Sequence, residues 1–313
     1  MGIETAAVVA SNGAPNTLDQ RLLLMHQAML GDSIRLEVYK RALQHHLKPG
    51  DVVVDVGSGL LPLSLLSLRL GASHVYAVEG DLQTVALARQ IVKRNNLQNQ
   101  LTIIQGDART VRLREKADVL VSEMMGNLGS EEEMAEIILP MARHNLHHTA
   151  RIIPSRLVTQ LQAVQFDKEG WGVWSDNFAG YSLHVVQEYA PAVPQVHFFT
   201  RTPRMLSAPV VVAASELGQN AYQPQGEHAL QINAPGQLQA VVGYFTATLA
   251  PDVTLSNFPS YAGCNWATWI WPVRHTEVCS GDVIRVKLQQ PQRTRVVSDW
   301  RLECQIVRSM GKN

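Results

Sequence analysis

The stretch that decides the fold runs from Asp51 to Gly59 and reads D-V-V-V-D-V-G-S-G. Its apolar run is typical of a strand that is buried on both faces of a parallel sheet. The strand breaks at Gly57-Ser58-Gly59, and the apolar run that follows, Leu60 to Leu70, is long enough for a helix. A glycine turn between a strand and a helix lets the backbone approach a ligand and points helix N–H groups at it. The stretch therefore predicts a nucleotide-type cofactor site at the end of a strand.

A second strand, predicted over His74 to Val78, ends in Glu79, where an acid is well placed to bind the two hydroxyls of a ribose. A dinucleotide site requires G-x-G-x-x-G, but the position three after Gly59 is Pro62, so the nicotinamide fingerprint fails. The turn, the acid and Gly106-Asp107-Ala108 after a third strand instead resemble the class I S-adenosylmethionine methyltransferases. The resemblance implies that the turn holds the amino acid part of the cofactor, the acid holds the ribose, and the third-strand segment borders the adenine.

Alternating strands and helices surround this predicted site. The segments are a helical region over Leu22 to Leu47, a helix over Leu82 to Asn96, and strands over Leu101 to Gln105 and Asp118 to Ser122. Ligands of such sheets bind beyond the carboxyl ends of the strands, so four residues should gather on one edge: Gly57, Glu79, Asp107 and Glu123. We therefore predict a Rossmann-like domain over residues 17–152.

From Ile152-Ile153-Pro154 onward, short β-rich runs separated by Gly, Pro and Asn replace the helical periodicity. The runs are Leu157 to Val164, Val210 to Ala213, Gln239 to Leu249, Val283 to Leu288 and Arg301 to Val307. They predict an antiparallel barrel or sandwich over residues 153–313. An aromatic-dense insertion, Trp171 to Tyr181, interrupts the pattern, and it fits either a core cluster or a docking arm over about residues 168–190.

The composition excludes several classes of protein. The formal net charge is zero and charged residues make up 17% of the chain, so we expect no general attraction to nucleic acid or to a membrane surface. Three widely spaced cysteines predict neither a disulfide framework nor a metal site, and they favour a reducing compartment. Residues 1–16 are predicted to be disordered and lack a secretory signal. We therefore expect a cytoplasmic protein.

An acid-rich loop follows the fourth strand, from Ser122 to Met134. In one interpretation Glu131 to Glu133 begin a helix that Ser130 caps, because acids suit the positive end of a helix dipole. In the other, Glu123 is paired with one of these acids folded back toward it. Two carboxylates that face one pocket require a cation between them, and a planar guanidinium matches this arrangement.

Here the chain resembles the protein arginine methyltransferases, from about residue 22 to the C-terminus and most specifically from His26 to Pro154. Three motifs carry the resemblance: H-x-x-M-L-x-D-x-x-R at His26 to Arg35, S-E-M-M-G with E-E-M in the acid loop, and W-x-x-N-x-x-G at Trp174 to Gly180. The resemblance implies a class I methyltransferase domain followed by an antiparallel β-barrel domain. It also implies a dimerisation arm at Trp171 to Tyr181 and a head-to-tail homodimer.

The resemblance also assigns roles to individual residues. The family spacing of nine places the two catalytic acids on Glu123 and Glu132. The implied residues for S-adenosylmethionine, and for its product S-adenosylhomocysteine, are His26, Met29, Arg35, Asp55, Gly57, Gly59, Glu79, Asp107 and Ala108. Arg35 is expected to bind the cofactor carboxylate. The implied substrate residues are Met134, Asn265 and Trp266.

The chain departs from the family pattern at several positions. Leu61 replaces a glycine, Met124 a tryptophan, and Arg109 the acid that borders the adenine amino group. The Y-F-x-x-Y segment expected before His26 is absent, and Asn265 stands where a histidine is usual. These changes affect the predicted substrate more than the predicted cofactor.

The expected function is therefore N-methylation of the guanidino group of arginine, either free or within a peptide. One alternative is a small-molecule C- or N-methyltransferase on the same scaffold, for example with an aromatic, indole-type acceptor. The least favoured alternative is a non-catalytic, cofactor-binding regulator.

Overall fold

The computed structural model describes residues 19–175, 177–189, 193–259, 263, 266–289 and 300–309. Our prediction of disorder over residues 1–16 lies outside them. The described chain begins with α1 (Gln20–Gly31) and α2 (Ser33–His46), where the sequence predicted one helical region. The Asp32 side chain divides them, because it accepts a hydrogen bond of 3.1 Å from the backbone N–H of Arg35 and so caps α2.

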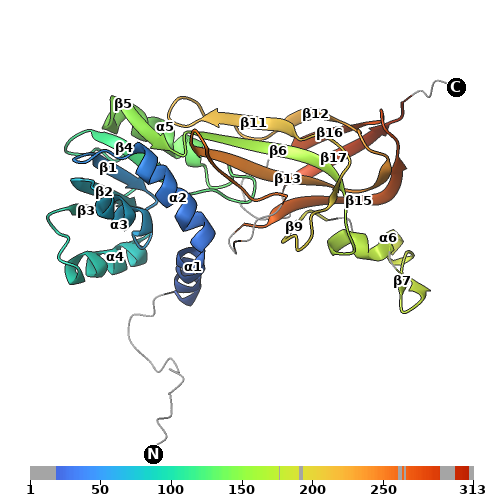
Figure 1. Ribbon diagram of the computed structural model, residues 1–313, viewed down its shortest axis with the longest axis horizontal. Helices are drawn as coiled ribbons and strands as arrows, with labels where there is room; N and C mark the ends of the chain where they lie inside the picture. Colours follow the sequence, from blue (N-terminus) through green and yellow to red (C-terminus); the bar gives the residue numbers. More distant parts are fainter. Residues whose placement is uncertain are drawn as a thin grey trace, which may run out of the picture.

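A five-stranded parallel sheet follows, with strand order β3-β2-β1-β4-β5. The strands are β1 (Val52–Val56), β2 (His74–Glu79), β3 (Leu101–Gln105), β4 (Ala117–Ser122) and β5 (Leu146–Ile153). The connecting helices are α3 (Pro62–Arg69), α4 (Leu82–Arg94) and α5 (Met134–Asn145). Figure 1 shows α3 and α4 on one side of the sheet and α5 on the other.

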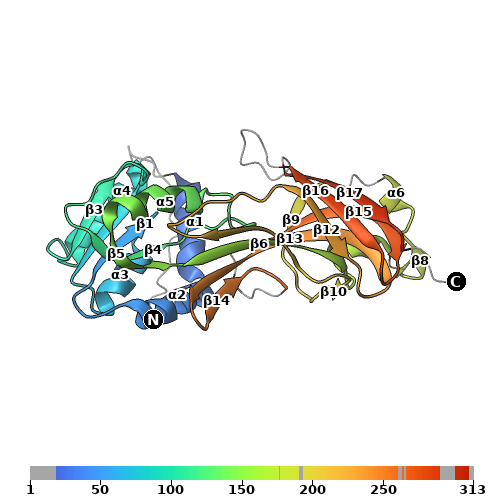
Figure 2. The ribbon, with the colours of Figure 1, turned by 90° about the horizontal axis from the view of Figure 1, so that it is seen from above.

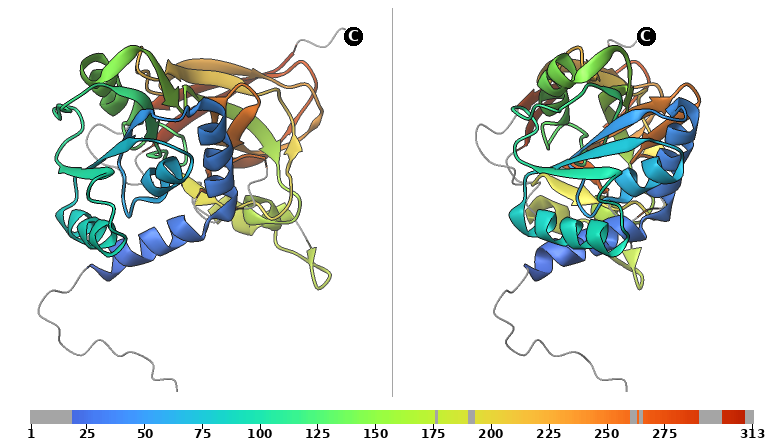
Figure 3. Two further views of the ribbon diagram at one scale, coloured as in Figure 1. Left: turned by 60° about the vertical axis from the view of Figure 1, so that its left-hand side comes forward. Right: turned by 90° about the vertical axis from the view of Figure 1, so that its left-hand side faces the viewer.

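The two directions of strand order explain this placement of the helices. From β1 the chain moves outward to β2 and β3, and from β4 it moves the opposite way to β5. Right-handed crossovers in opposite directions put their helices on opposite faces of a sheet. The reversal lies between β1 and β4, and a reversal of this kind opens a crevice for a ligand at the carboxyl ends of the strands. The sequence prediction of a Rossmann-like domain is confirmed (Figure 3).

The second half of the chain consists of antiparallel strands in two sheets (Figure 2). The larger sheet contains β6 (Arg156–Gln165), β9 (Gln195–His197), β10 (Arg204–Met205), β11 (Val210–Glu216), β13 (Gly236–Ala250), β14 (Val253–Ser256) and β15 (Thr268–Val278). The smaller contains β12 (Gly226–Gln231), β16 (Val283–Gln289) and β17 (Arg301–Val307). Both sheets contribute to one apolar core, which includes Leu161, Val241 and Trp269 from the larger and Ile284 and Val286 from the smaller. Across the described residues these strands pair as two sheets rather than as one closed ring.

The aromatic insertion divides into a buried part and an exposed part. It comprises the 3-10 helix η1 (Gly170–Ser175), the hairpin of β7 (Asn177–Phe178) and β8 (Tyr181–Ser182), and α6 (Val186–Tyr189). Trp171 is buried, and its indole N–H donates to the Val273 carbonyl at 3.0 Å. Phe178, Tyr181 and Tyr189 are 71%, 77% and 82% exposed. The insertion is therefore anchored in the core at one end and projects from the molecule at the other (Figure 1).

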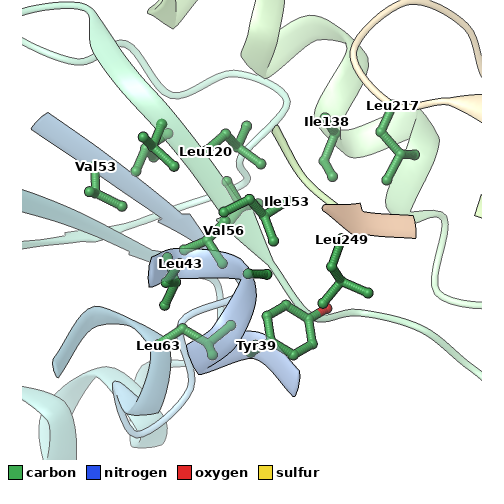
Figure 4. Close-up of a cluster of buried hydrophobic side chains, with 14 of the residues drawn as sticks. Tyr39, Leu43, Val53, Val56, Leu63, Leu120, Ile138, Ile153, Leu217 and Leu249 are labelled. Atoms are coloured by element: carbon green, nitrogen blue, oxygen red, sulfur yellow. The ribbon is translucent and has the colours of Figure 1, made fainter. Parts of the chain in front are cut away.

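A second apolar core joins the two halves of the chain. Figure 4 shows Leu43 of α2 beside Val56 of β1, Tyr39 of α2 beside Leu249 of β13, and Leu217 beside Ile138 of α5, all within one cluster. Each of these side chains is at least 97% buried, and burying such a side chain contributes about 1.5–3 kcal/mol. The parallel sheet and the antiparallel sheets therefore form one packed body, and side chains from both can meet at a shared site. No helix in the described ranges is long and apolar enough to cross a membrane.

Candidate active site

The glycine turn after β1 is packed closely on both sides. The backbone N–H groups of Gly57 and Ser58 both donate to the Val78 carbonyl, at 2.9 and 3.1 Å, so β2 holds the turn. Gly57 has φ +72°, and a Cβ there would lie 2.8 Å from the Met124 sulfur. Gly59 has φ +53°, and a Cβ there would lie 3.1 Å from the His26 ring. Both positions therefore require glycine for backbone conformation and for space.

Glu79 lies beside this turn, at the end of β2. One of its oxygens accepts the N–H of Gly59 at 2.9 Å, and the other accepts the N–H of Asp81 at 2.9 Å. A carboxylate has about four lone-pair sites, so both oxygens can accept further hydrogen bonds, such as those from a pair of hydroxyls. The structure thus places the predicted ribose acid next to the predicted turn.

Two cavities meet at Gly57. The larger has a volume of about 380 Å³ and lies at the carboxyl ends of β1 to β3, where Glu79, Asp107 and Ala108 line it. The smaller has a volume of about 30 Å³, and its lining includes His26, Met29, Arg35, Gly59 and Glu123. Eight of the nine predicted cofactor residues line one of these two cavities.

The ninth, Asp55, lies beneath the turn and lines neither cavity. It is 1% exposed, and the Ser64 hydroxyl donates to its Oδ2 at 2.7 Å. Burial raises the pKa of Asp55 to about 7, against the hydrogen bonds from Ser64, which lower it. Within the described residues its Oδ1 and the Ser58 Oγ are both buried without a hydrogen-bond partner. Buried polar atoms normally have a partner, and Ser58 lines the smaller cavity, so its hydroxyl fits a ligand with hydrogen-bonding groups such as an amino acid.

α1 covers the turn through His26. The side chain is 6% exposed, and its Nε2 lies 3.3 Å from the Thr84 hydroxyl of α4. Burial lowers the pKa of His26, and the charges of Glu79 and Asp81 oppose this shift. A neutral imidazole therefore packs against Gly59.

Arg35 and Glu123 form a buried ion pair between α2 and the end of β4. The Arg35 guanidinium also donates to the Met29 carbonyl and lies 5.7 Å from the centre of the Trp266 ring. Arg35 is 4% exposed, so a lone charge there would be costly, and the carboxylate offsets it. The predicted cofactor cation and one predicted catalytic acid are thus direct neighbours.

Burial raises the pKa of Glu123, Arg35 opposes the shift, and the charge of Glu132 adds to it. Glu132 therefore lies near enough to interact with Glu123 through its charge. Glu132 itself is exposed. A charge interaction thus links the two acids that the sequence analysis selected.

The other two acids of the loop face elsewhere. Glu131 turns toward the protein and accepts the backbone N–H of Leu128 at 2.7 Å. Glu133 forms an ion pair with Arg109, which also lies 3.3 Å from Asp107. Arg109 thereby ties the edge of the larger cavity to the acid loop, a link that the sequence analysis missed. The sequence signal at this position was that Arg109 replaces the acid expected from the resemblance.

The helix that we predicted at Glu131 to Glu133 begins later, so that interpretation was wrong. α5 starts at Met134, Glu133 precedes it with φ +57°, and the Ser130 hydroxyl caps nothing. The acids are used in side-chain contacts instead of in the first helical turn. Met134 is fully buried in the core that joins the two halves and lines neither cavity.

The antiparallel half holds the acid loop in place. The Trp266 indole donates to the Met125 carbonyl at 2.6 Å, and the Thr159 hydroxyl donates to the Leu128 carbonyl at 2.7 Å. The Asn257 amide donates to the Asn127 carbonyl at 2.8 Å. Trp266 was predicted at the site, whereas Thr159 and Asn257 carry no sequence signal. The predicted Asn265 lies outside the described residues.

The known proteins that resemble this chain in sequence include methyltransferases. A family model described as ribosomal protein L11 methyltransferase (PrmA) matches residues 38–169. Probable protein arginine N-methyltransferase 6.1 of Oryza sativa subsp. indica is 35% identical over 157 residues, which are 49% of this chain and 41% of the rice protein. Protein arginine N-methyltransferase 1 of Chlamydomonas reinhardtii is 26% identical over 270 residues, covering 82% of this chain and 77% of that protein. The chain thus aligns with about two fifths of the rice protein's length.

Solved structures extend the likeness to both halves of the fold. Protein arginine methyltransferase 10 of Arabidopsis thaliana superposes with a TM-score of 0.74 at 21% identity, covering 93% of this chain and 96% of that one. The Trypanosoma brucei PRMT1 enzyme–prozyme heterotetrameric complex with AdoHcy gives a TM-score of 0.71 at 21% identity, covering 91% and 98%. The whole described architecture is therefore shared with these structures.

Proposed function

We propose that this chain is a member of the protein arginine methyltransferase family and that it transfers a methyl group from S-adenosylmethionine to the guanidino group of arginine, which its likeness to arginine N-methyltransferases supports. The observation that carries the proposal is the charge interaction of Glu132 with Glu123, which lines the smaller cavity. A guanidinium is a planar cation that carboxylates bind bidentately. The likeness to a complex with AdoHcy, the demethylated cofactor, supports the same cofactor here.

The cofactor supplies a methyl group that is activated by its bond to a sulfonium. The turn at Gly57 to Gly59 would hold the amino acid part of the cofactor, Glu79 would bind the ribose hydroxyls, and Asp107 and Ala108 would border the adenine. Arg35 would bind the cofactor carboxylate, and its ion pair with Glu123 would link the cofactor to the substrate acid. Positioning of the two reactants accounts for most of the catalysis that the protein must provide.

Glu123 and Glu132 hold the substrate guanidinium and offset its charge beside the sulfonium. They also polarise electron density toward the nitrogen that accepts the methyl group. This is needed because the nitrogen lone pairs of a guanidinium are otherwise delocalised over the whole group. As the nitrogen–carbon bond forms, the sulfur–carbon bond breaks and the sulfur keeps the electron pair. The methylated nitrogen then loses a proton to solvent. Met29 lines the smaller cavity together with Glu123.

We also propose a head-to-tail homodimer, in which the projecting arm of one protomer covers α1 of the other. The arm presents Phe178, Tyr181 and Tyr189, and α1 presents Leu24 and Leu30, which are 63% and 45% exposed. Exposed apolar clusters of this kind mark contact surfaces. Assembly of a structural neighbour as a heterotetramer is consistent with this proposal. We further propose a cytoplasmic location, which the unpaired thiols of Cys279 and Cys304 support.

Mass spectrometry of reactions with S-adenosylmethionine and either free L-arginine or an arginine-rich peptide tests the activity. A gain of one or two methyl groups on either substrate supports the proposal and identifies the substrate form. Glu123→Gln and Glu132→Gln should each reduce turnover about 100-fold or more, because each removes a charge that faces the guanidinium. Cofactor affinity should fall less than threefold in the Glu132 variant.

Glu37→Gln, an exposed acid of α2 that pairs with Lys40, provides the matched control and should keep wild-type turnover. Wild-type methylation by either catalytic variant would contradict the assigned roles. Methylation of an aromatic metabolite, with both arginine substrates unchanged, would replace the proposal with the small-molecule alternative.

A further inference from the structure

Among the three consecutive acids Glu131 to Glu133, Glu131 is the one whose carboxylate is enclosed by protein groups. Its Oε2 accepts the Leu128 N–H at 2.7 Å, and its Oε1 accepts the Trp269 indole N–H at 2.5 Å. Trp269 belongs to β15, is 1% exposed and stacks on Trp271. One carboxylate therefore joins the turn of the acid loop to the core of the antiparallel half.

Gly126 provides the space for this carboxylate. A Cβ at Gly126 would lie 2.2 Å from the Glu131 Oε2 and 2.7 Å from the Glu131 Cβ. The backbone of Gly126 also pairs with Gly129, whose N–H donates to the Gly126 carbonyl at 2.9 Å. The Glu131 side chain thus packs against the Gly126–Gly129 turn, where the absence of a side chain on Gly126 leaves room for the carboxylate.

The chemistry of this contact requires a carboxylate. Burial raises the pKa of Glu131, and the bonds from Leu128 and Trp269 oppose that shift. Both neighbours are N–H donors, so both oxygens must accept. Hydrogen bonds to an ionised carboxylate are stronger than those between neutral groups, and they offset the cost of burial. A carboxamide would place an N–H group against one of the two donors.

Glu131, Glu132 and Glu133 have identical side chains, so their chemistry alone does not decide which of them faces Glu123. The inward contact of Glu131 removes this ambiguity. With Glu131 held against Gly126 and Trp269, the next residue is exposed and interacts with Glu123 through its charge. Glu133 is then left to pair with Arg109.

We propose that Glu131 is a positioning residue of the active site, which binds Leu128 and Trp269 and so fixes the register in which Glu132 faces a guanidino substrate. This inference rests on the proposed function for its substrate, but its structural content can be tested separately. Glu131 contacts neither cofactor nor substrate and acts through Glu132.

The first test compares Glu131→Gln, Glu132→Gln and the double variant by steady-state methylation of an arginine substrate. Glu131→Gln should reduce kcat/KM at least tenfold and raise KM, while cofactor Kd changes less than twofold. The double variant should be no slower than Glu132→Gln alone. Glu131 acts only through the Glu132 carboxylate, and both of these variants lack that carboxylate. The inference would be overturned if the loss of kcat/KM in the double variant equalled the product of the two single losses. Wild-type kcat/KM for Glu131→Gln would also overturn it.

A second variant approaches the same contact from the other side. Gly126→Ala places a methyl group where the Glu131 carboxylate lies, so it should reproduce the loss of kcat/KM. Glu227→Gln, an exposed acid of β12, is the matched control and should keep wild-type values. A normal KM in the Gly126→Ala variant would count against the inference.

A measurement without substrate separates the inference from the proposed function. Carbon-13 NMR titration of the Glu123 carboxyl reports the nearby charge of Glu132, which raises the Glu123 pKa. Glu132→Gln should lower that pKa, Glu131→Gln should lower it similarly, and the double variant should lower it no further. A Glu123 pKa that Glu132→Gln lowers and Glu131→Gln leaves unchanged would overturn the inference even in an enzyme whose substrate differs from the one proposed.

Discussion

At the scale of single residues, Asp55 should make stability depend on pH in an unusual direction. Its pKa is about 7 in the folded protein, raised by burial, against an ordinary value of 3.8. Between pH 4 and 7 the folded state therefore holds a proton that the unfolded state has lost, so the free energy of unfolding falls as pH rises. We expect Asp55 to account for a loss of about 2–4 kcal/mol across this window.

Urea unfolding at pH 4.5 and pH 7.5 checks this expectation. Asp55→Asn removes the titrating group, so the variant should gain stability relative to the wild type as pH rises. Asp252→Asn, an exposed acid between β13 and β14, should follow the wild type. Equal pH dependence of the wild type and Asp55→Asn would rule out the buried neutral carboxyl.

Sequence reasoning located most of the site because strand ends and turns are determined locally. Glu79 was predicted to lie on the same edge as Gly57, and it bonds to Gly59 of the same turn at 2.9 Å. The ion pair of Arg35 with Glu123 could not be predicted, since it depends on where α2 packs against β4. Met134 was expected beside the substrate but is fully buried, because α5 begins at that residue and turns it into the core.

At the scale of elements, the start of α3 contains an unusual residue. Leu61 precedes the helix with φ +71° and is fully buried, at a position where the family has a glycine. A left-handed conformation costs a residue with a Cβ about 1 kcal/mol or more, whereas the buried side chain stabilises the core. Leu61→Ala should lose the packing and keep the strain, and Leu61→Gly should lose the packing and relieve it.

We therefore expect both variants to be less stable than the wild type, by about 2–5 kcal/mol for Leu61→Ala and about 1 kcal/mol less than that for Leu61→Gly. This order reverses the usual preference for alanine over glycine at a helix. Thermal or urea unfolding of the pair provides the measurement. Alanine equal to or better than glycine would show that the conformation carries no strain.

Strands with a regular apolar pattern, either continuous or alternating, were predicted well, and strands in which polar residues or proline interrupt the pattern were missed. β1, β2 and β17 match their predicted ranges within one residue because their inward faces are apolar at regular spacing. β5 was missed because His147, His148 and Thr149 break that pattern with exposed polar side chains. β15 was missed because it contains Pro272, which argues against a strand unless tertiary packing overrides it.

At the scale of the whole molecule, the arm should control assembly. Tyr181→Ser with Tyr189→Ser removes two exposed rings, so analytical ultracentrifugation should show a dimer dissociation constant raised at least tenfold. Tyr222→Ser, which removes a ring that is 59% exposed in the loop between β11 and β12, is the matched control. A wild-type protein that sediments as a monomer at every concentration would contradict the proposed dimer.

The active site should also depend on the contact between the two halves of the chain. Asn257 is 3% exposed, and its amide donates to the carbonyls of Asn127 at 2.8 Å and Ala267 at 2.7 Å. Asn257→Asp has nearly the same shape but presents an oxygen to both carbonyls. We expect KM for the arginine substrate to rise at least tenfold, because the acid loop loses its support, while cofactor Kd stays within twofold.

Asn95→Asp is the control for a lost amide–carbonyl bond, since the Asn95 amide donates to the Ile91 carbonyl at 2.8 Å at the end of α4. It should lower stability without changing KM. If Asn257→Asp weakened cofactor and substrate binding equally, the contact would serve only to hold the two halves together. A selective rise in KM would instead mean that the antiparallel half shapes the substrate site from a distance, by fixing the backbone of the acid loop while the parallel sheet holds the cofactor.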